Sequence, residues 1–169
     1  FHGYHMGVTA ENVAEKFQIT RNEQDKFALM SQEKAHKAQK QNRFKAEIIN
    51  YKIRSKKAEI DFDKDEHPRE GINLDALSRL KPVFKKDGTV TAGNASGIND
   101  GAAAVTLMSS EEAEKRGIEK LVSIKSWASC GVDPALMGTG PIPSSKKALE
   151  IAGWNIKDVD LFEINEAFA

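Results

Sequence analysis

The spacing of apolar residues predicts two helices near the start of the chain. Residues 9–17 are expected to form a short helix with Thr9 as a candidate cap, and residues 21–41 a long one. In the long helix, small and apolar side chains recur every three or four residues, while Lys, Gln and Glu occupy the opposite face. Thr20 and Glu23 have the spacing of a capping box, which predicts where this helix begins.

The pattern changes after the long helix. Residues 47–54 alternate between apolar and polar side chains, which predicts a half-buried strand. The highly charged residues 57–71 are expected to form a short strand and an exposed loop. Leucines at helical spacing then predict a helix over 73–80, with Asn73 as its cap, followed by a turn at 85–89. The first hundred residues therefore indicate an irregular α+β region.

From residue 102 onward, the predicted order is strand, helix, strand, loop, helix, strand. The helix before Gly117 should be capped by Ser109, and the later helix covers 143–153. The expected strands are residues 102–109, 121–129 and 159–164. Such alternation is typical of a layered α/β sheet.

Composition excludes several classes of protein. Hydrophobic residues make up 40% and charged residues 30% of the chain, which is typical of a soluble folded protein. Lys+Arg and Asp+Glu both number 25, so the basic excess of a nucleic-acid-binding protein is missing. No apolar run approaches the roughly 20 residues of a membrane span, and no signal peptide is recognisable. A single cysteine, Cys130, rules out an internal disulfide and favours a reduced, cytoplasmic setting.

Residues 90–105, VTAGNASGINDGAAAV, contain almost no side chain large enough to build a core. Gly93, Gly97 and Gly101 fall four residues apart. The spacing matches neither a phosphate loop nor a dinucleotide-binding motif. From the residues alone, the stretch could be a linker, a close contact with a helix, or a surface on which a ligand lies.

Candidate chemistry is sparse. Asn165, directly after a predicted strand, could stabilise an oxyanion or could cap a following helix. The segment 137–143, MGTGPIP, is predicted to be a stiff loop that could line a pocket. His5 could contact a ligand or serve as a base, although a structural role is the commoner one. Cys130 follows an apolar segment and is expected to be structural, and no metal-binding motif is recognisable.

Five stretches carry a resemblance to a known family. They are GYHMGVTAENVAEKF, RNEQDKFALMSQEKA, DGTVTAGNASGINDGAAA, GVDPALMGTGPIPSSKKAL and LFEINEAFA. Together they resemble the thiolases, and within that family the acetyl-CoA acetyltransferases of the bacterial biosynthetic type. The chain begins without Met and stops without a closing element, so we expect it to be an internal fragment of such a protein.

The resemblance implies a fold and a reaction. The fold would be a layered α-β-α-β-α arrangement of two similar α/β halves, partial here, with an inserted α+β loop domain. Residues 1–96 would be most of the loop domain, 97–118 the end of the N-terminal half, and 119–169 the start of the C-terminal half. The reaction would be the reversible condensation of two acetyl-CoA to acetoacetyl-CoA and CoA through an acetyl-cysteine intermediate. Coenzyme A thioesters would be substrates, with no permanently bound cofactor, and the complete protein would be a homodimer or homotetramer in lipid metabolism.

The resemblance also assigns roles to individual residues. Asn165 would hold a water that hydrogen-bonds the thioester oxygen, and Ser96 would meet the pantetheine arm. Arg69 would lie near the nucleotide end of the coenzyme, where relatives place a serine at the position of Ala76. The remaining residues expected to contact the substrate are His5, Met6, Phe84, Ala92, Met137, Ala167 and Phe168.

Some parts of the family's machinery are not in this sequence. The nucleophilic cysteine of the N-terminal half, the GHP histidine and the CxG cysteine are all missing, and Cys130 matches no catalytic position. We therefore expect the chain to be inactive alone. The alternatives are a 3-ketoacyl-CoA thiolase of fatty-acid breakdown, with the same machinery and a longer acyl pocket, and a non-catalytic CoA-binding fragment.

Overall fold

The structure is a computed structural model that describes residues 2–54 and 58–169. Two compact units emerge from its contacts. The larger unit comprises Tyr4–Gly97 and Glu166–Ala169, and the smaller unit consists mainly of Ile98–Asn165. The predicted division at residues 96/97 and 118/119 concerns domains of a complete thiolase and stays a prediction.

The larger unit begins with helix α1, Met6–Phe17. The cap is His5, whose Nδ1 accepts a hydrogen bond from the backbone N–H of Gly7 at 3.0 Å. The prediction that Thr9 caps this helix is wrong. Thr9 lies inside the first turn, where its hydroxyl donates to the carbonyl of Met6 at 2.6 Å, and His5 supplies the acceptor that a helix start requires.

Helix α2, Arg21–Lys40, begins where the sequence predicts. Thr20 N–H donates to the Glu23 carboxylate at 2.7 Å, and Glu23 N–H donates to the Thr20 hydroxyl at 3.3 Å. The capping box is therefore confirmed. Gln24, Asp25 and Ala28 form the buried side of this helix.

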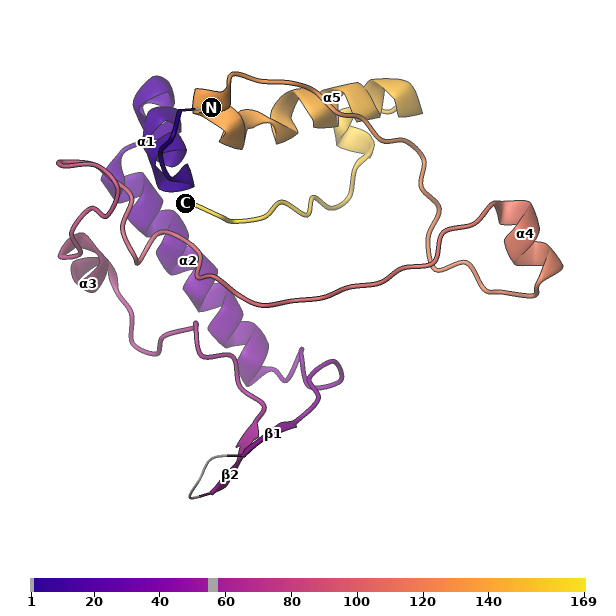
Figure 1. Cartoon of the computed structure of the whole chain (residues 1–169), viewed down its shortest axis with the longest axis horizontal. Helices are drawn as coiled ribbons and strands as arrows, with labels where there is room; N and C mark the ends of the chain where they lie inside the picture. The colour runs from indigo at the N-terminus through magenta and orange to yellow at the C-terminus, as the bar shows by residue number, and fades with distance from the viewer. Residues whose placement is uncertain (1, 55–57) are drawn as a thin grey trace. The chain divides into compact units, whose positions relative to one another are not determined.

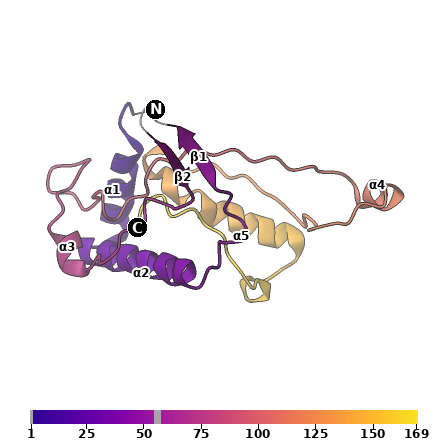
Figure 2. The ribbon, with the colours of Figure 1, turned by 90° about the horizontal axis from the view of Figure 1, so that it is seen from below.

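After α2, strands β1 (Tyr51–Arg54) and β2 (Glu59–Phe62) form an antiparallel hairpin, which is visible in both views (Figures 1 and 2). The predicted strand 47–54 thus starts only at Tyr51. Residue 57, which begins the predicted charged segment, lies outside the described residues. All eight strand residues are exposed, so the hairpin is held by its ladder and not by a core.

The core of the larger unit lies where helix α3, Leu74–Ser78, meets the segment after it. Asn73 caps α3 as predicted, because its side-chain oxygen accepts from the N–H of Ala76 at 2.9 Å. The fully buried side chains with the largest volumes are Leu77, Val90 and Thr91. The turn predicted at 85–89 is closed by a hydrogen bond from Gly88 N–H to Lys85 O at 3.0 Å.

The smaller unit contains helices and irregular chain. Its elements are α4 (Ser110–Lys115), the 3-10 helix η1 (Pro134–Thr139), α5 (Pro141–Ala152) and the 3-10 helix η2 (Ile156–Asp158). Ser109 caps α4 as predicted, with its hydroxyl accepting from Glu112 N–H at 3.2 Å, and Gly117 follows with φ +64°. Gly153, at φ +69°, ends α5 as predicted.

The three strands predicted in the smaller unit are wrong. Residues 102–109, 121–129 and 159–164 have no strand structure (Figure 1). A strand exists only through hydrogen bonds to a neighbouring strand, and in the described part of the chain paired strands are confined to β1 and β2. These segments have the apolar pattern of strands, but among the described residues no neighbouring strand pairs with them.

The loop predicted at 137–143 is also wrong. Its first part belongs to η1 and its second part begins α5 at Pro141. Prolines fit the first turn of a helix, because the N–H groups there have no partner inside the helix. A Pro-rich segment therefore became a helix start. Among the described residues, no helix is both long and apolar enough to cross a membrane.

Candidate functional site

Glu11, on α1, holds the start of the glycine-rich stretch. Its side chain is only 4% exposed. The carboxylate accepts hydrogen bonds from Thr89 N–H at 2.8 and 2.9 Å, from the Thr89 hydroxyl at 2.9 Å, and from Val90 N–H at 2.8 Å. These donors replace the water that a buried carboxylate loses. The chain at 89–90 is therefore tied to α1.

Asn94 ties the next residues to α2. Its Oδ1 accepts from Thr91 N–H at 2.7 Å, and its Nδ2 donates to the carbonyl of Thr89 and to Asp25 Oδ1, both at 3.0 Å. Asp25 is itself paired with Arg21, whose Nε donates to Asp25 Oδ2 at 2.8 Å. Asn94 and Asp25 are each 3% exposed. Residues 89–94 are thus fixed against two helices by buried polar groups.

The C-terminal residues lie antiparallel to residues 94–96. Ala169 N–H donates to Asn94 O at 2.9 Å, and Ser96 N–H donates to Ala167 O at 3.0 Å. These bonds form an isolated bridge between Ala95 and Phe168. Segments that are 71 to 75 residues apart in the sequence therefore share one short pairing.

Phe84 connects this pairing to the start of α1. Its ring stacks on His5 with centroids 4.6 Å apart, and meets the edge of Phe168 at 6.2 Å. A methyl group at Gly7 would come within 2.1 Å of the Phe84 ring, so only glycine leaves room for this position of the ring. The aromatic contacts bring together three residues, His5, Phe84 and Phe168, that the family resemblance assigned to substrate binding.

Most of the residues predicted to contact the substrate belong to the larger unit. Ala92 and Ser96 are exposed on either side of the buried Asn94. Met6, beside His5, is 45% exposed at the start of α1. Arg69 is exposed, and its backbone N–H donates to the Gln32 side chain at 2.9 Å. Its binding role stays a prediction, as do those of the other residues.

Two predicted residues belong to the smaller unit. Met137 lies in η1 and is 47% exposed. Asn165 is exposed and lies in irregular chain, and residues 166–169 after it form no helix. The interpretation of Asn165 as a helix cap stays a prediction. Its role as the holder of a water stays a prediction.

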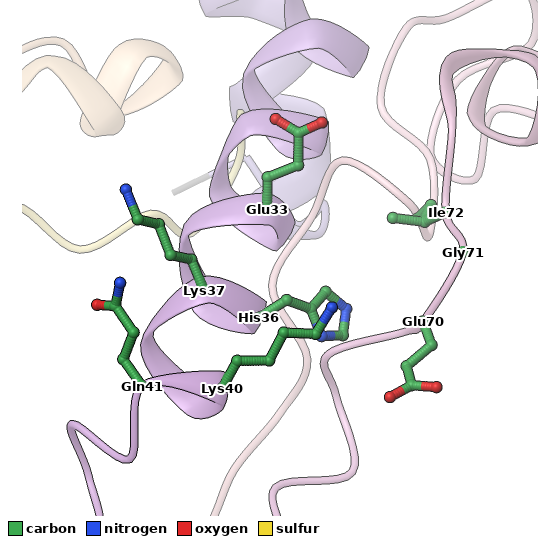
Figure 3. Close-up of a pocket in the computed structure, with 8 residues that line it drawn as sticks. All are labelled: Glu33, His36, Lys37, Lys40, Gln41, Glu70, Gly71 and Ile72. Carbon is green, nitrogen blue, oxygen red and sulfur yellow. The ribbon is translucent and has the colours of Figure 1, made fainter.

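A separate open pocket of about 610 Å³ lies at the C-terminal end of α2 (Figure 3). Figure 3 shows the ring of His36 directed from α2 toward residues 70–72. In the part of the chain that is described, Nε2 of this ring is buried without a hydrogen-bond partner. The lining residues are Glu33, His36, Lys37, Lys40, Gln41, Glu70, Gly71 and Ile72. Its mixed charges indicate no single class of ligand, and it contains none of the predicted site residues.

Two family models of known proteins match this chain. A family model described as "Thiolase, N-terminal domain" matches residues 1–111, and one described as "Thiolase, C-terminal domain" matches residues 118–169. The chain belongs to the thiolase family. This confirms the resemblance drawn from the sequence.

Individual relatives give the same family and the fold. An acetyl-CoA acetyltransferase of Rhizobium meliloti is 59% identical over the whole chain, which spans 43% of that protein. The crystal structure of the Bacillus anthracis acetyl-CoA acetyltransferase superposes with a TM-score of 0.90 at 49% identity, over 99% of this chain and 43% of that one. Human mitochondrial 3-ketoacyl-CoA thiolase gives a TM-score of 0.87 at 45% identity, over 96% and 41%. The thiolase fold is thereby confirmed as a partial one.

Sequence reasoning missed the buried polar residues of this thiolase segment: Glu11, Asp25 and Asn94. In the sequence, the first two look like ordinary charged positions of amphipathic helices. Glu11 and Asp25 are buried only because hydrogen-bond partners 78 and 69 residues away in the sequence lie against them. One signal was available in the sequence. In the segment TAGNAS, Asn94 has no other large side chain beside it, which favours Asn94 as the residue that reaches the interior.

Proposed function

We propose that this sequence forms the coenzyme A-binding part of an acetyl-CoA acetyltransferase. The complete enzyme would condense two acetyl-CoA to acetoacetyl-CoA and CoA, and would also run the reaction in reverse. The chain spans 43% of the Rhizobium meliloti relative, so the activity, the substrates and the assembly of a complete protein are all part of this proposal.

The pairing of residues 94–96 with the C-terminal segment supports the proposal best. Ser96, Ala167 and Phe168, which the resemblance assigns to the pantetheine arm or the acyl group, are joined there by a backbone hydrogen bond and a bridge. Phe84 packs on the edge of Phe168. Ala92, Ser96 and Ala167 have short side chains, which leave space for a narrow, flexible ligand arm to approach the backbone.

The chemistry needs groups beyond this chain. A cysteine thiolate would attack the thioester carbonyl of acetyl-CoA, forming acetyl-cysteine and releasing CoA as its thiolate. A second cysteine would take the α-proton of another acetyl-CoA, whose carbanion would attack the acetyl-cysteine and release the cysteine thiolate. In this scheme Asn165 would hold a water against the thioester oxygen and stabilise its developing charge.

Ser96→Ala in the full-length enzyme that would contain this sequence tests the proposed contact. Loss of one hydrogen bond to the pantetheine arm should raise the KM for acetyl-CoA roughly 2- to 10-fold and leave kcat nearly unchanged, because the arm is bound in the ground and transition states alike. Steady-state kinetics measure both constants. Ser109→Ala, which alters a helix cap in the other unit, is the matched control. An unchanged KM in Ser96→Ala would overturn the contact.

Further measurements test the alternative functions, the assembly and the location. The ratio of kcat/KM for acetoacetyl-CoA to that for longer 3-ketoacyl-CoAs distinguishes the acetyl-specific enzyme from a thiolase of fatty-acid breakdown. Thiolysis by the 169-residue chain alone should be undetectable, because the family's catalytic cysteines are missing from it. Light scattering on the full-length enzyme tests the proposed homodimer or homotetramer, and cell fractionation tests its proposed cytoplasmic location.

A further inference from the structure

Both the oxygen and the nitrogen of the Asn94 side-chain amide are hydrogen-bonded within the protein. A carboxamide offers two N–H donors and one oxygen acceptor. Here the oxygen accepts from Thr91 N–H at 2.7 Å, while the nitrogen donates to Thr89 O and Asp25 Oδ1, each at 3.0 Å. Neither a carboxylate nor an apolar side chain of the same size could satisfy all three partners.

Asp25, which accepts the hydrogen bond from Asn94, is itself held by Arg21. Asp25 Oδ2 accepts from Arg21 Nε at 2.8 Å, and an NH2 group of Arg21 donates to the carbonyls of Leu77 and Leu80 at 2.6 and 3.0 Å. A continuous chain of hydrogen bonds therefore runs from α3 through Arg21 and Asp25 to Asn94. Because Asp25 and Asn94 are buried, solvent does not easily replace the bond between them.

The backbone of Asn94 takes part in the pairing with the C-terminal segment. Its carbonyl accepts from Ala169 N–H at 2.9 Å, and two residues later Ser96 donates to Ala167 O at 3.0 Å. Ala92 and Ser96 lie two residues away on either side. A shift of Asn94 would therefore move Ser96 and Ala167 together.

We propose that Asn94 is a positioning residue for coenzyme A binding: held by Asp25 and Arg21, it fixes the backbone that presents Ala92, Ser96 and Ala167 to the pantetheine arm. This inference rests on the proposed function. Asn94 does not itself touch the substrate, since its side chain is buried against α2 with only 3% exposed.

The first test is Asn94→Ala in the full-length enzyme. Displacement of Ser96 and Ala167 should raise the KM for acetyl-CoA by roughly tenfold, while kcat at saturation changes by less than about threefold. The control is Ser109→Ala, which removes a helix cap without touching this network. A KM within about twofold of the wild type would overturn the proposal.

A double-mutant cycle distinguishes positioning from general damage. If Asn94 acts through Ser96, the double variant Asn94→Ala with Ser96→Ala should have a KM close to that of the more severe single variant. If the two effects multiply, the proposal is overturned. If Ser96→Ala alone leaves KM unchanged while the Asn94→Ala variant raises it, the proposed pantetheine contact fails and this inference fails with it.

Variants of Asp25 keep the test decisive if Asn94→Ala does not fold. Asp25→Asn retains an oxygen that can accept from Asn94, so its KM should stay within about threefold of the wild type. Asp25→Ala removes the acceptor and should raise KM by roughly tenfold. Equal KM values for the two Asp25 variants would contradict a role that passes through the hydrogen bond to Asn94.

Discussion

The two units of this thiolase segment differ in how their chain is held. In the larger unit, irregular residues such as Val90 and Thr91 are buried, because the carboxylate of Glu11 on α1 and the side-chain amide of Asn94 bind their backbone. In the smaller unit, strongly apolar residues remain exposed: Leu121 is 92% and Trp127 80% exposed. Hydrophobicity alone therefore does not decide which irregular residues are buried: their backbone groups also need polar partners.

The difference has a simple physical basis. Irregular backbone can enter a core only if each N–H and C=O finds a partner, and Glu11 and Asn94 provide those partners. An apolar strand needs a neighbouring strand for the same purpose, and the described residues offer none to 102–109 or 121–129. The smaller unit therefore keeps only elements that satisfy their own hydrogen bonds, namely short helices.

The largest effect should come from a cavity in the larger unit. Leu77→Ala in the 169-residue chain should lower the free energy of unfolding by about 2–5 kcal/mol, because Leu77 is only 1% exposed. Leu121→Ala is the matched control in the smaller unit and should change it by no more than about 0.5 kcal/mol. Urea unfolding followed by circular dichroism measures both. Equal losses of unfolding free energy in the two variants would contradict the difference in burial between the two units.

A smaller effect should come from the buried carboxylate of α1. Glu11→Gln replaces one accepting oxygen by an NH2 group facing backbone donors, and should cost about 1.5–3 kcal/mol in the same unfolding experiment. Glu15→Gln is the control, since Glu15 pairs with Lys85 on the surface and its loss should be smaller. A larger loss for Glu15→Gln would contradict the importance of burial.

The surface pair should also have its own pH dependence. The hydrogen bond from Lys85, aided by its charge, lowers the pKa of Glu15 below its ordinary value. The pair's contribution is therefore complete above the ordinary carboxyl pKa and is lost as the pH falls through the lowered one. The small difference between wild type and Glu15→Gln should accordingly vanish in acid, as unfolding curves at neutral pH and at pH about 2 would reveal.

The least damaging changes compare two glycines of the same stretch. A methyl group at Gly93 would come within 2.5 Å of Leu80 and 2.6 Å of Leu77, so Gly93→Ala should cost about 1–2 kcal/mol through overpacking. Gly101→Ala meets nothing within 4 Å and should be neutral or slightly stabilising. Thermal unfolding of both variants measures the contrast. A destabilising Gly101→Ala would reveal a contact that the present arrangement lacks.

The stretch 90–105, which contains these two glycines, shows how much of the structure the sequence could predict. For residues 90–97 the linker interpretation is wrong, since Val90, Thr91 and Asn94 are buried. Close packing on a helix holds at Gly93, which faces Leu77 of α3. From Ile98 to Val105 the chain is exposed and irregular. One run of small residues thus has two structural roles, and a pattern of Gly and Ala cannot tell them apart.

Local signals determined several helix ends of this chain. The capping box at Thr20, the cap at Asn73 and the glycine after α5 each act through residues within four positions, so the sequence alone predicted where these elements begin or end. The family, too, followed from short motifs. Tertiary structure alone decided that Asp25 and Asn94 meet, that Ser96 pairs with Ala167, and that the apolar segments form no strands. Each of these depends on a partner far away in the chain, and periodicity contains no information about distant partners.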